Sequence, residues 1–198
     1  MKPVLFGSYY MDVEELSLPG VFLFSPKRHG DERGFFSETF KAREFDEIVP
    51  GISLVQDNHS LSHDAGVIRG LHFQIPPHAQ GKLVRVPRGR VLDVVVDLRI
   101  GSPTYGKHLS VELSADNWQQ LWVPPGFAHA FCTLVPETEF CYKVSDYYAP
   151  DCDFGIAYND PDLGIDWPFD PTDQILSEKD QKLPRLKDFT SPFRFEGM

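Results

Sequence analysis

Apolar and polar residues alternate along several segments in the middle of this chain, which is the pattern of half-buried β-strands. Residues 82–86 (KLVRV) alternate, and residues 90–98 (RVLDVVVDL) follow after a Pro-Arg-Gly turn, so the two segments predict a β-hairpin. A second hairpin is expected around Pro136-Glu137. The other expected strands are residues 21–24, 68–74, 108–113, 121–123, 127–135 and 138–145.

Helical patterns are few and short. Residues 41–48 predict one helix and residues 116–120 a weak turn, and Ser177 with Asp180 three residues later resembles a capping box. Many short strands separated by Gly and Pro turns are typical of an all-β sandwich or barrel, and the 17 Pro suit sheet edges and turns. The sequence therefore predicts an all-β fold with a few short peripheral helices.

The length and the composition fit one domain with a substantial core. The 198 residues are 41% hydrophobic and include 16 Phe. We expect a single domain over residues 1–198, with an N-terminal arm over about residues 1–30. The Pro-rich C-terminal tail, about residues 165–198, is expected to wrap the surface.

The charge balance excludes some classes of protein. A net charge of −10 and a pI of about 5.1 argue against a general nucleic-acid binder, which would show a basic face. The chain has no stretch of about 18 apolar residues that would predict a membrane span, and residues 1–10 lack the apolar run of a signal peptide. Cys132, Cys141 and Cys152 form an odd set without a C-x-x-C pair, so we expect reduced thiols in a cytoplasmic protein.

His72 and Lys82 are the first candidates for chemistry, because they lie ten residues apart on two predicted strands. An imidazole takes or gives a proton near pH 7, and an ammonium stabilises a negative oxygen as it forms. Together they suit proton transfer next to a carbonyl. A core histidine with a satisfied hydrogen bond and a solvated lysine at a strand end are the plainer alternatives, and the two residues alone favour these alternatives.

The segment 124–129 (PPGFAH) has the form P-x-G-x-x-H, which in cupin jelly rolls aims a strand-borne histidine, here His129, into the barrel. The other cupin motif supplies H-x-H and a carboxylate for a metal ion, but here Gln74 follows His72 and the next candidate is Gln80. Neutral amides are poor ligands for transition metals, and two histidines do not form a metal site by themselves. We therefore expect a cupin-type jelly-roll barrel without a metal.

A set of short motifs follows in one order along about residues 20–180; each motif is weak alone, but the set is specific. The motifs are residues 30–36 (GDERGFF), 56–60 (QDNHS), 69–74 (RGLHFQ), 80–86 (QGKLVRV), 93–99 (DVVVDLR), 102–106 (SPTYG), 120–122 (QLW), 126–129 (GFAH), 142–143 (YK), 159–161 (NDP) and 176–180 (LSEKD). In these motifs the chain resembles the dTDP-4-dehydrorhamnose 3,5-epimerase family. The resemblance implies a cupin fold and an isomerase that acts on a nucleotide sugar.

The resemblance assigns a proton-transfer set by matched position. His72 would be the general base, with Asp180 as the carboxylate that orients it and stabilises its cation. Lys82 would face the sugar ketone, and Tyr142 would be the acid on the opposite face of the ring. Without the resemblance, Asp180 could be only a helix cap, and Tyr142 would more commonly belong to a cross-strand aromatic pair.

The resemblance also assigns substrate contacts. Arg69 would hold the pyrophosphate, because a planar guanidinium suits phosphate oxygens, and a plain surface arginine is the alternative. Asp93 matches a carboxylate close to the barrel histidine and could equally be a strand-end charge. The remaining positions that match substrate-binding residues of the family are Arg33, Glu38, Gln56, Asp57, Asn58, Lys82, His129, Asp153 and Lys179.

Three residues depart from the family pattern. His29 stands where relatives often carry a Phe against the nucleotide base, which puts stacking there in doubt. Asp153 stands where Glu is common, and Ala130 replaces a frequent Gly after His129. None of the three belongs to the proton-transfer set.

The reaction that the resemblance implies is epimerisation of dTDP-4-dehydro-6-deoxy-D-glucose at C3 and C5 to dTDP-4-dehydro-L-rhamnose. It needs no metal, nicotinamide or flavin, and the chain carries no G-x-G-x-x-G after a strand. The resemblance also implies a homodimer whose exchanged N-terminal strands bring Arg33 and Glu38 to the partner's site. A one-centre epimerase on a related nucleotide sugar, a metal-dependent cupin enzyme and a non-catalytic sugar-nucleotide binding module are the alternatives.

Overall fold

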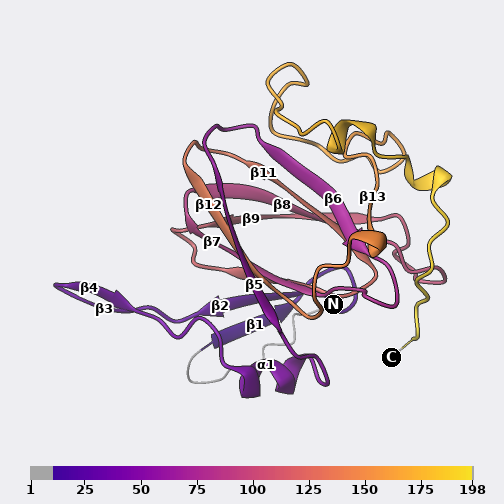
Figure 1. Cartoon of the computed structure of the whole chain (residues 1–198). Helices are drawn as coiled ribbons and strands as arrows, with labels where there is room; N and C mark the ends of the chain where they lie inside the picture. The colour runs from indigo at the N-terminus through magenta and orange to yellow at the C-terminus, as the bar shows by residue number, and fades with distance from the viewer. Residues whose placement is uncertain (1–10, 198) are drawn as a thin grey trace.

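The computed structural model describes residues 11–197, which form two antiparallel β-sheets that face each other as the walls of a barrel (Figure 1). The six-stranded sheet has the order β1 (Met11–Glu15), β2 (Phe22–Pro26), β10 (Gln120–Val123), β7 (Lys82–Arg88), β12 (Thr138–Val144), β5 (Gln56–Ser62). The five-stranded sheet has the order β13 (Asp153–Gly155), β6 (Ile68–Gln74), β11 (Phe127–Thr133), β8 (Arg90–Asp97), β9 (His108–Ser114). The all-β fold expected from the sequence is confirmed. Both expected hairpins are wrong, because β7 and β8 lie in different sheets, and so do β11 and β12: each turn carries the chain from one sheet to the other.

The helices are as short as the sequence indicates. The α-helix α1 (Ala42–Ile48) begins one residue later than expected. The 3₁₀ helices are η1 (Pro150–Cys152), η2 (Asp180–Lys182) and η3 (Leu186–Asp188). Near residues 116–120 the chain forms a turn over residues 115–117 and then enters β10.

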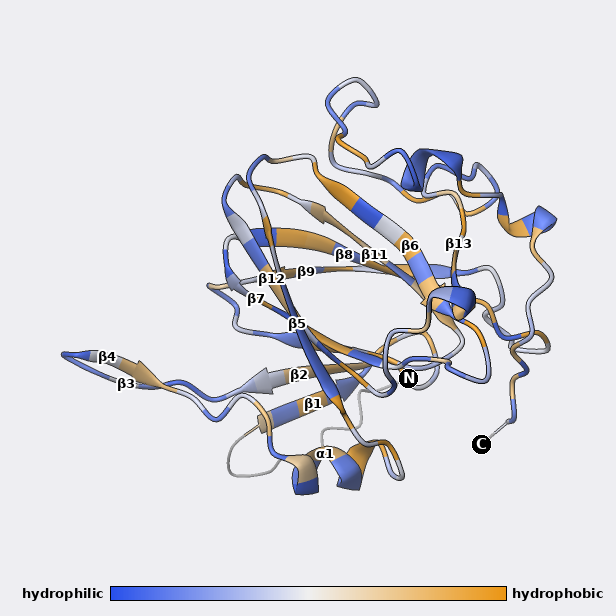
Figure 2. Ribbon diagram, viewed as in Figure 1, coloured by the Kyte–Doolittle hydropathy of each residue, from blue (hydrophilic) through white to orange (hydrophobic). Residues whose placement is uncertain are grey.

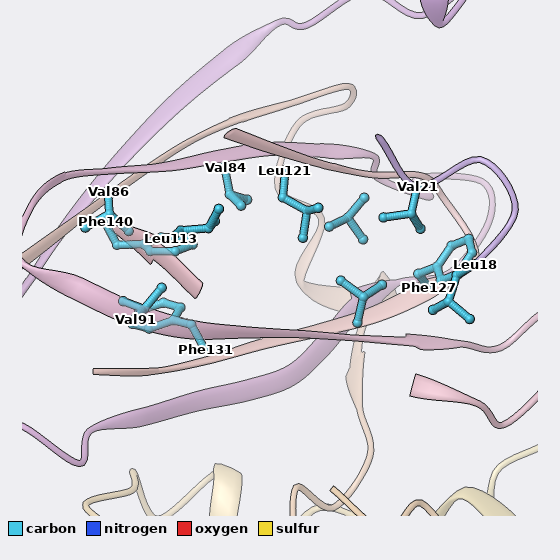
Figure 3. Close-up of a cluster of buried hydrophobic side chains, with 12 residues drawn as sticks. Leu18, Val21, Val84, Val86, Val91, Leu113, Leu121, Phe127, Phe131 and Phe140 are labelled. Carbon is cyan, nitrogen blue, oxygen red and sulfur yellow. The ribbon is translucent and has the colours of Figure 1, made fainter. Parts of the chain in front are cut away.

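The core lies partly inside the barrel and partly outside it, and β8 contributes to both. Val91 and Val95 point into the barrel, where they belong to the buried cluster that Figure 3 shows between the sheets. Val94 and Val96 belong to a second cluster, on the outer face of the five-stranded sheet. Successive side chains of a strand point to opposite faces, so burial on both faces explains the nearly continuous apolar run of residues 90–98. Figure 2 shows this run as a largely hydrophobic ribbon.

The C-terminal segment, residues 156–197, covers the outer cluster (Figure 1). The rings of Phe189 and Phe193 lie with their centroids 5.1 and 6.2 Å from the ring of Phe73 on β6. An apolar outer face of a sheet must be covered by another layer, and here the layer is irregular chain rather than helix.

Strands that the apolar pattern does not indicate lie at sheet edges. β5 (QDNHSLS) ends the six-stranded sheet, and its residues alternate between half-buried and exposed until Ser62. Its inward side chains are polar, so hydrophobic alternation is absent although the strand is regular. β1 forms the opposite edge of this sheet beside β2. Residues 1–10 of the expected N-terminal arm lie outside the described residues.

A further hairpin, β3 (His29–Asp31) and β4 (Gly34–Phe36), projects away from the barrel (Figure 1). All of its residues are exposed, including Phe36. The ring of Phe35 contacts Trp118, with the ring centroids 5.0 Å apart. Exposed aromatic side chains grouped on a projecting hairpin are typical of a surface that another chain covers.

Gly70 lies where β6 and β11, the strands that carry His72 and His129, approach closely. Its φ angle is +132°, a conformation that L side chains rarely adopt. A Cβ atom at this position would lie 2.4 Å from the Cβ of Ala130 and 2.6 Å from the carbonyl oxygen of His129. Glycine is therefore required here, because any side chain would push the two strands apart.

We expect Gly70→Ala to lower the free energy of unfolding by about 2–4 kcal/mol, because it adds backbone strain to an overlap with β11. Gly101→Ala is the matched control: the φ angle of Gly101 is +89°, but a Cβ atom there meets nothing within 4 Å. This control should cost about 1 kcal/mol from backbone strain alone. Urea unfolding measures both values, and equal losses would contradict a role for the close approach of the strands.

Candidate active site

A cavity of about 580 Å³ lies between the two sheets, within the size range of small-molecule sites. Strands of both sheets and residues 175–180 of the C-terminal segment contribute to its wall. The residues assigned from the sequence that line the cavity are His72, Lys82, Tyr142, Asp180, Arg69, His129 and Lys179. The structure thus brings the whole expected proton-transfer set to one cavity.

His72 on β6 forms a short hydrogen bond with Asp180, the first residue of η2: the imidazole Nε2 lies 2.6 Å from the carboxylate Oδ1. Burial would raise the pKa of the Asp180 carboxyl, but hydrogen bonds from His72 and Ser177 outweigh burial and lower this pKa below its ordinary value. Asp180 is therefore ionised at neutral pH. An ionised carboxylate fixes the tautomer of the imidazole and leaves its other ring nitrogen to accept a proton.

Asp180 also takes part in the cap that the sequence suggests. Its backbone N–H donates to the Ser177 Oγ over 3.1 Å. The backbone of Asp180 therefore serves the turn while its carboxylate serves His72. The capping interpretation and the catalytic interpretation describe different atoms of one residue.

Tyr142 and Lys82 lie on the opposite wall, because β12 and β7 belong to the six-stranded sheet whereas β6 belongs to the five-stranded sheet. Burial raises the pKa of the Tyr142 phenol, and the nearby Arg69 charge opposes this shift only in part. The phenol is therefore protonated at neutral pH and able to donate a proton. Tyr142 also lies near Phe140, with ring centroids 6.1 Å apart, so it has the aromatic neighbour that a structural role would need.

The Lys82 ammonium reaches across the cavity and donates to the carbonyl oxygen of His72 over 3.3 Å. The protein atoms packed around it lower its pKa to about 8, although the negative charges of Asp153 and Asp93 act in the opposite direction. This ammonium is thus largely charged at pH 7 and titrates just above it.

His129 on β11 stands beside His72 in the β6–β11 register and is paired with Asp93 of β8. The imidazole Nε2 lies 2.9 Å from each carboxylate oxygen. Asp93 is fully buried, and burial raises its pKa, while the charges of His129 and Lys82 oppose that shift. Asp93 is therefore a buried partner of the barrel histidine rather than a solvated strand-end charge.

Charged side chains form a rim at the cavity. Arg69 is exposed on β6 and lines the cavity, and Lys179 lines it next to Asp180. The Nζ of Lys179 lies 2.5 Å from the Oδ2 of Asp153, whose carboxylate also accepts from the Tyr148 hydroxyl over 3.3 Å. This rim presents two cationic side chains to a ligand, and the carboxylate of Asp153 holds one of them.

β5 carries the next group of assigned residues. Gln56 and Asn58 share a face of the strand with Ser60 and Ser62, two residues of the cavity wall, and the Nε2 of Gln56 donates to the Oδ1 of Asn58 over 2.9 Å. Asp57 lies on the other face, where its Oδ1 accepts from Lys143 over 2.8 Å. Its side chain is therefore not directed to this cavity.

Arg33 and Glu38 lie outside the cavity of their own chain. Arg33 is exposed on the β3–β4 hairpin and pairs with Asp31, with the charged atoms 2.5 Å apart. Glu38 pairs with Lys41, with a distance of 2.6 Å between the charged atoms.

Sequence reasoning did not assign three serine hydroxyls to the site. Ser60, Ser62 and Ser177 all line the cavity. Alternate side chains of a strand share one face, so a strand predicted over residues 56–62 would have placed Ser60 and Ser62 on the same face as Gln56 and Asn58.

Within residues 11–197, no three or more His, Cys, Asp or Glu side chains gather in a way that could hold a metal ion. In this same part of the chain, no helix is long and apolar enough to cross a membrane.

The model of the dTDP-4-dehydrorhamnose 3,5-epimerase family matches residues 15–188. The chain belongs to this family. A dTDP-4-dehydrorhamnose 3,5-epimerase from Sinorhizobium fredii is 50% identical over 185 residues, which are 93% of this chain and 94% of the relative. Family membership confirms the resemblance seen in the motifs and makes the chain an isomerase.

Solved structures of epimerases share the fold. A dTDP-6-deoxy-D-glucose-3,5-epimerase from Legionella pneumophila, in complex with dTDP-4-keto-L-rhamnose, is 42% identical, with a TM-score of 0.90 over 95% of this chain and 100% of that one. A dTDP-4-dehydrorhamnose 3,5-epimerase from Bacillus anthracis, with TDP and PPi bound, is 48% identical, with a TM-score of 0.85 over 88% of this chain and 99% of that one. The cupin-type jelly roll expected from the sequence is therefore confirmed.

The departures from the epimerase pattern have distinct surroundings in this chain. His29 lies on the exposed hairpin, away from the cavity of its own chain. Ala130 packs against Gly70, where the ideal Cβ of Gly70 would overlap it. Asp153 reaches Lys179 despite its shorter side chain.

Proposed function

We propose that this epimerase converts dTDP-4-dehydro-6-deoxy-D-glucose to dTDP-4-dehydro-L-rhamnose by inverting C3 and C5, without a metal or a redox cofactor. The observation that carries the proposal is the placement of His72 and Tyr142 on opposite walls of one cavity. Inversion requires one group to remove a proton and another to return a proton to the opposite face. A single base that returned its own proton would retain the configuration.

Proton removal is assigned to His72. C3 and C5 both flank the ketone at C4, so loss of either proton gives an enolate whose charge lies on the ketone oxygen. The Lys82 ammonium would stabilise that oxygen, and an interaction of this kind contributes about 10²–10³ in rate. Asp180 would stabilise the imidazolium that forms, because it is held ionised 2.6 Å from the ring.

Reprotonation is assigned to Tyr142. Its pKa is raised by burial, so the phenol carries its proton at neutral pH and can donate it to the carbanion carbon. The phenolate that results would be stabilised by the nearby positive charge of Arg69. The acid and the base then stand on different sheets, and the substrate ring lies between them.

The nucleotide is assigned to the rim and to β5. Arg69 would hold the pyrophosphate, with Lys179 and Asp153 beside it. Gln56 and Asn58 would contact the substrate with their amides, and Asp57 through its main chain, because its side chain lies on the other face. His129 and Lys82 would contact the sugar inside the barrel.

A homodimer would complete the site. Arg33 and Glu38 match substrate-binding positions of the family but lie outside the cavity of their own chain. The exposed β3–β4 hairpin would carry Arg33 to the partner's cavity and would bury Phe36 in the same step.

The compartment proposed is the cytoplasm. Burial raises the pKa of the Cys132 thiol to about 12, so this thiol stays protonated and unreactive there.

The test is incubation of the purified protein with dTDP-4-dehydro-6-deoxy-D-glucose in deuterated water, with the label read at each carbon by NMR. We expect deuterium at both C3 and C5 without added cofactor, and no effect of a chelator. Label at one carbon would indicate a one-centre epimerase, and loss of exchange with the chelator would indicate a metal-dependent cupin enzyme. Binding of dTDP without any exchange would indicate a binding module.

Two substitutions separate the roles of the proposed base and acid. His72→Asn should abolish exchange in a protein that still folds, whereas loss of a purely structural His72 would lower stability and leave the turnover per folded molecule unchanged. Tyr142→Phe should reduce formation of the inverted L-sugar more than exchange at C5, because His72 can still remove a proton. Equal losses of exchange and inversion in Tyr142→Phe, or inversion at the wild-type rate, would contradict the donor role.

The pKa of Lys82 predicts the alkaline limb of the pH profile. An ammonium with a pKa of about 8 loses its charge as the pH rises through that value, so kcat/KM should fall above about pH 8. Lys82→Arg keeps its charge, because a guanidinium has a pKa above about 12, so its profile should lack this limb although its rate is lower. A wild-type profile that is flat to about pH 10 would contradict the assignment.

Mixed subunits test the proposed exchange between protomers. The Arg33→Ala and His72→Asn variants are mixed, unfolded and refolded together. If Arg33 serves the partner's site, each heterodimer has one intact site, which combines His72 of the first variant with Arg33 of the second. Random assortment makes half of the dimers mixed, so about a quarter of the wild-type activity should return. Activity no higher than the sum of the two variants, or a sedimentation mass near 22.5 kDa for the wild type, would contradict the arrangement.

A further inference from the structure

Gln74 is a buried amide whose polar atoms bind the main chain of two loops. It shares a face of β6 with His72, because side chains two residues apart point the same way. Its Nε2 donates to the carbonyl oxygens of His78 (2.7 Å) and Tyr147 (3.2 Å), and its Oε1 accepts from the N–H of Ala149 (2.8 Å). An amide that is 3% exposed and makes three such bonds fixes the path of both loops.

Gln80, two residues before β7, also binds segment 145–149. Its Nε2 donates to the carbonyl oxygen of Asp146 over 2.7 Å, and the N–H of Gly81 donates to the Oγ of Ser145 over 2.7 Å. The ring of His78 adds a contact of 3.1 Å with the Asp146 carboxylate. Together with Gln74, these groups bind segment 145–149 at every residue except Tyr148.

Tyr148 connects this segment to the rim of the cavity. Its hydroxyl donates to the Oδ2 of Asp153 over 3.3 Å, and the same oxygen accepts from Lys179, which lines the cavity. Asp153 stands opposite Gln74 in the pairing of β13 with β6. A shift of segment 145–149 would therefore withdraw a hydrogen bond from the carboxylate that holds Lys179 at the cavity.

We infer that Gln74 and Gln80 are positioning residues for substrate binding: their amides hold segment 145–149 so that Tyr148 keeps its hydrogen bond to Asp153, the carboxylate that holds Lys179 at the cavity. These are the positions where a metal-binding cupin would carry ligands, and in this chain they anchor a loop instead. The inference concerns the same site as the proposed function and rests on that function for its kinetic test.

The experiment compares Gln74→Met and Gln80→Met with the wild type. Met keeps the length of the side chain and removes every hydrogen bond of the amide. We expect the KM for dTDP-4-dehydro-6-deoxy-D-glucose and the Kd for dTDP to rise about tenfold, while kcat falls less than about threefold. Gln119→Met is the matched control, because the half-buried Gln119 donates to Ser25 over 3.2 Å and does not line the cavity. Its KM and Kd should equal those of the wild type.

Hydrogen exchange of the peptide 145–152, read by mass spectrometry, gives a second readout that does not depend on activity. Gln74→Met should speed exchange in this peptide, since the N–H of Ala149 loses its acceptor. A wild type that fails to epimerise would refute the proposed function. Faster hydrogen exchange in the peptide 145–152 and weaker dTDP binding in Gln74→Met would still support this inference. A lower melting temperature with unchanged KM, Kd and peptide exchange would overturn it.

Discussion

Ionisable side chains inside a β-barrel cannot keep their full shell of water, and this constraint governs the arrangement of the active site. A buried charge costs several kcal/mol unless a partner compensates it. Here His72 is paired with Asp180 and His129 with Asp93, in each case by a hydrogen bond of 2.9 Å or less. Lys82 instead donates to a carbonyl oxygen, and its pKa falls to about 8. Burial of Lys82 therefore brings one ammonium within reach of titration near neutral pH.

The partner of His72 comes from the C-terminal segment, so the site is complete only when that segment lies on the barrel. A parallel bridge between Val67 and Ile175, with a hydrogen bond of 2.9 Å from the N–H of Ile68, fixes residues near Asp180 against the start of β6. The outer cluster, in which Phe73 contacts Phe189, holds the rest of the segment. Packing on the outside of the five-stranded sheet thus determines the position of a carboxylate on the inside. A site supported by backbone pairing and core packing is more precise than one on a free loop.

The sequence allowed the central strands and an all-β fold to be predicted, because β6, β7 and β8 carry strong alternation or long apolar runs. The cupin-type barrel was predicted from the motif of residues 124–129 and from the family resemblance. The sequence did not reveal β5. The inward residues of this strand are polar because they face the cavity, so the alternation of apolar residues that indicates a strand is missing. His72 and Lys82 could be singled out by residue type alone. Tyr142 and Asp180 required the family motifs, because a strand tyrosine and a capping aspartate have ordinary structural explanations. The pairing of His129 with Asp93 depends on the register of β11 with β8, which residue types do not specify.

The barrel also bears on how one pair of residues could serve two carbons under the proposed mechanism. His72 and Tyr142 lie on strands of two sheets whose separation is set by the buried cluster between them. Close-packed walls of this kind do not shift by the distance between C3 and C5 of a sugar ring. Both carbons flank the same ketone, so a ring whose ketone oxygen stays at Lys82 can present either carbon by turning about that contact. The motion that distinguishes inversion of one centre from inversion of two therefore belongs to the substrate, and the groups that restrain its nucleotide at the rim decide how far the ring can turn.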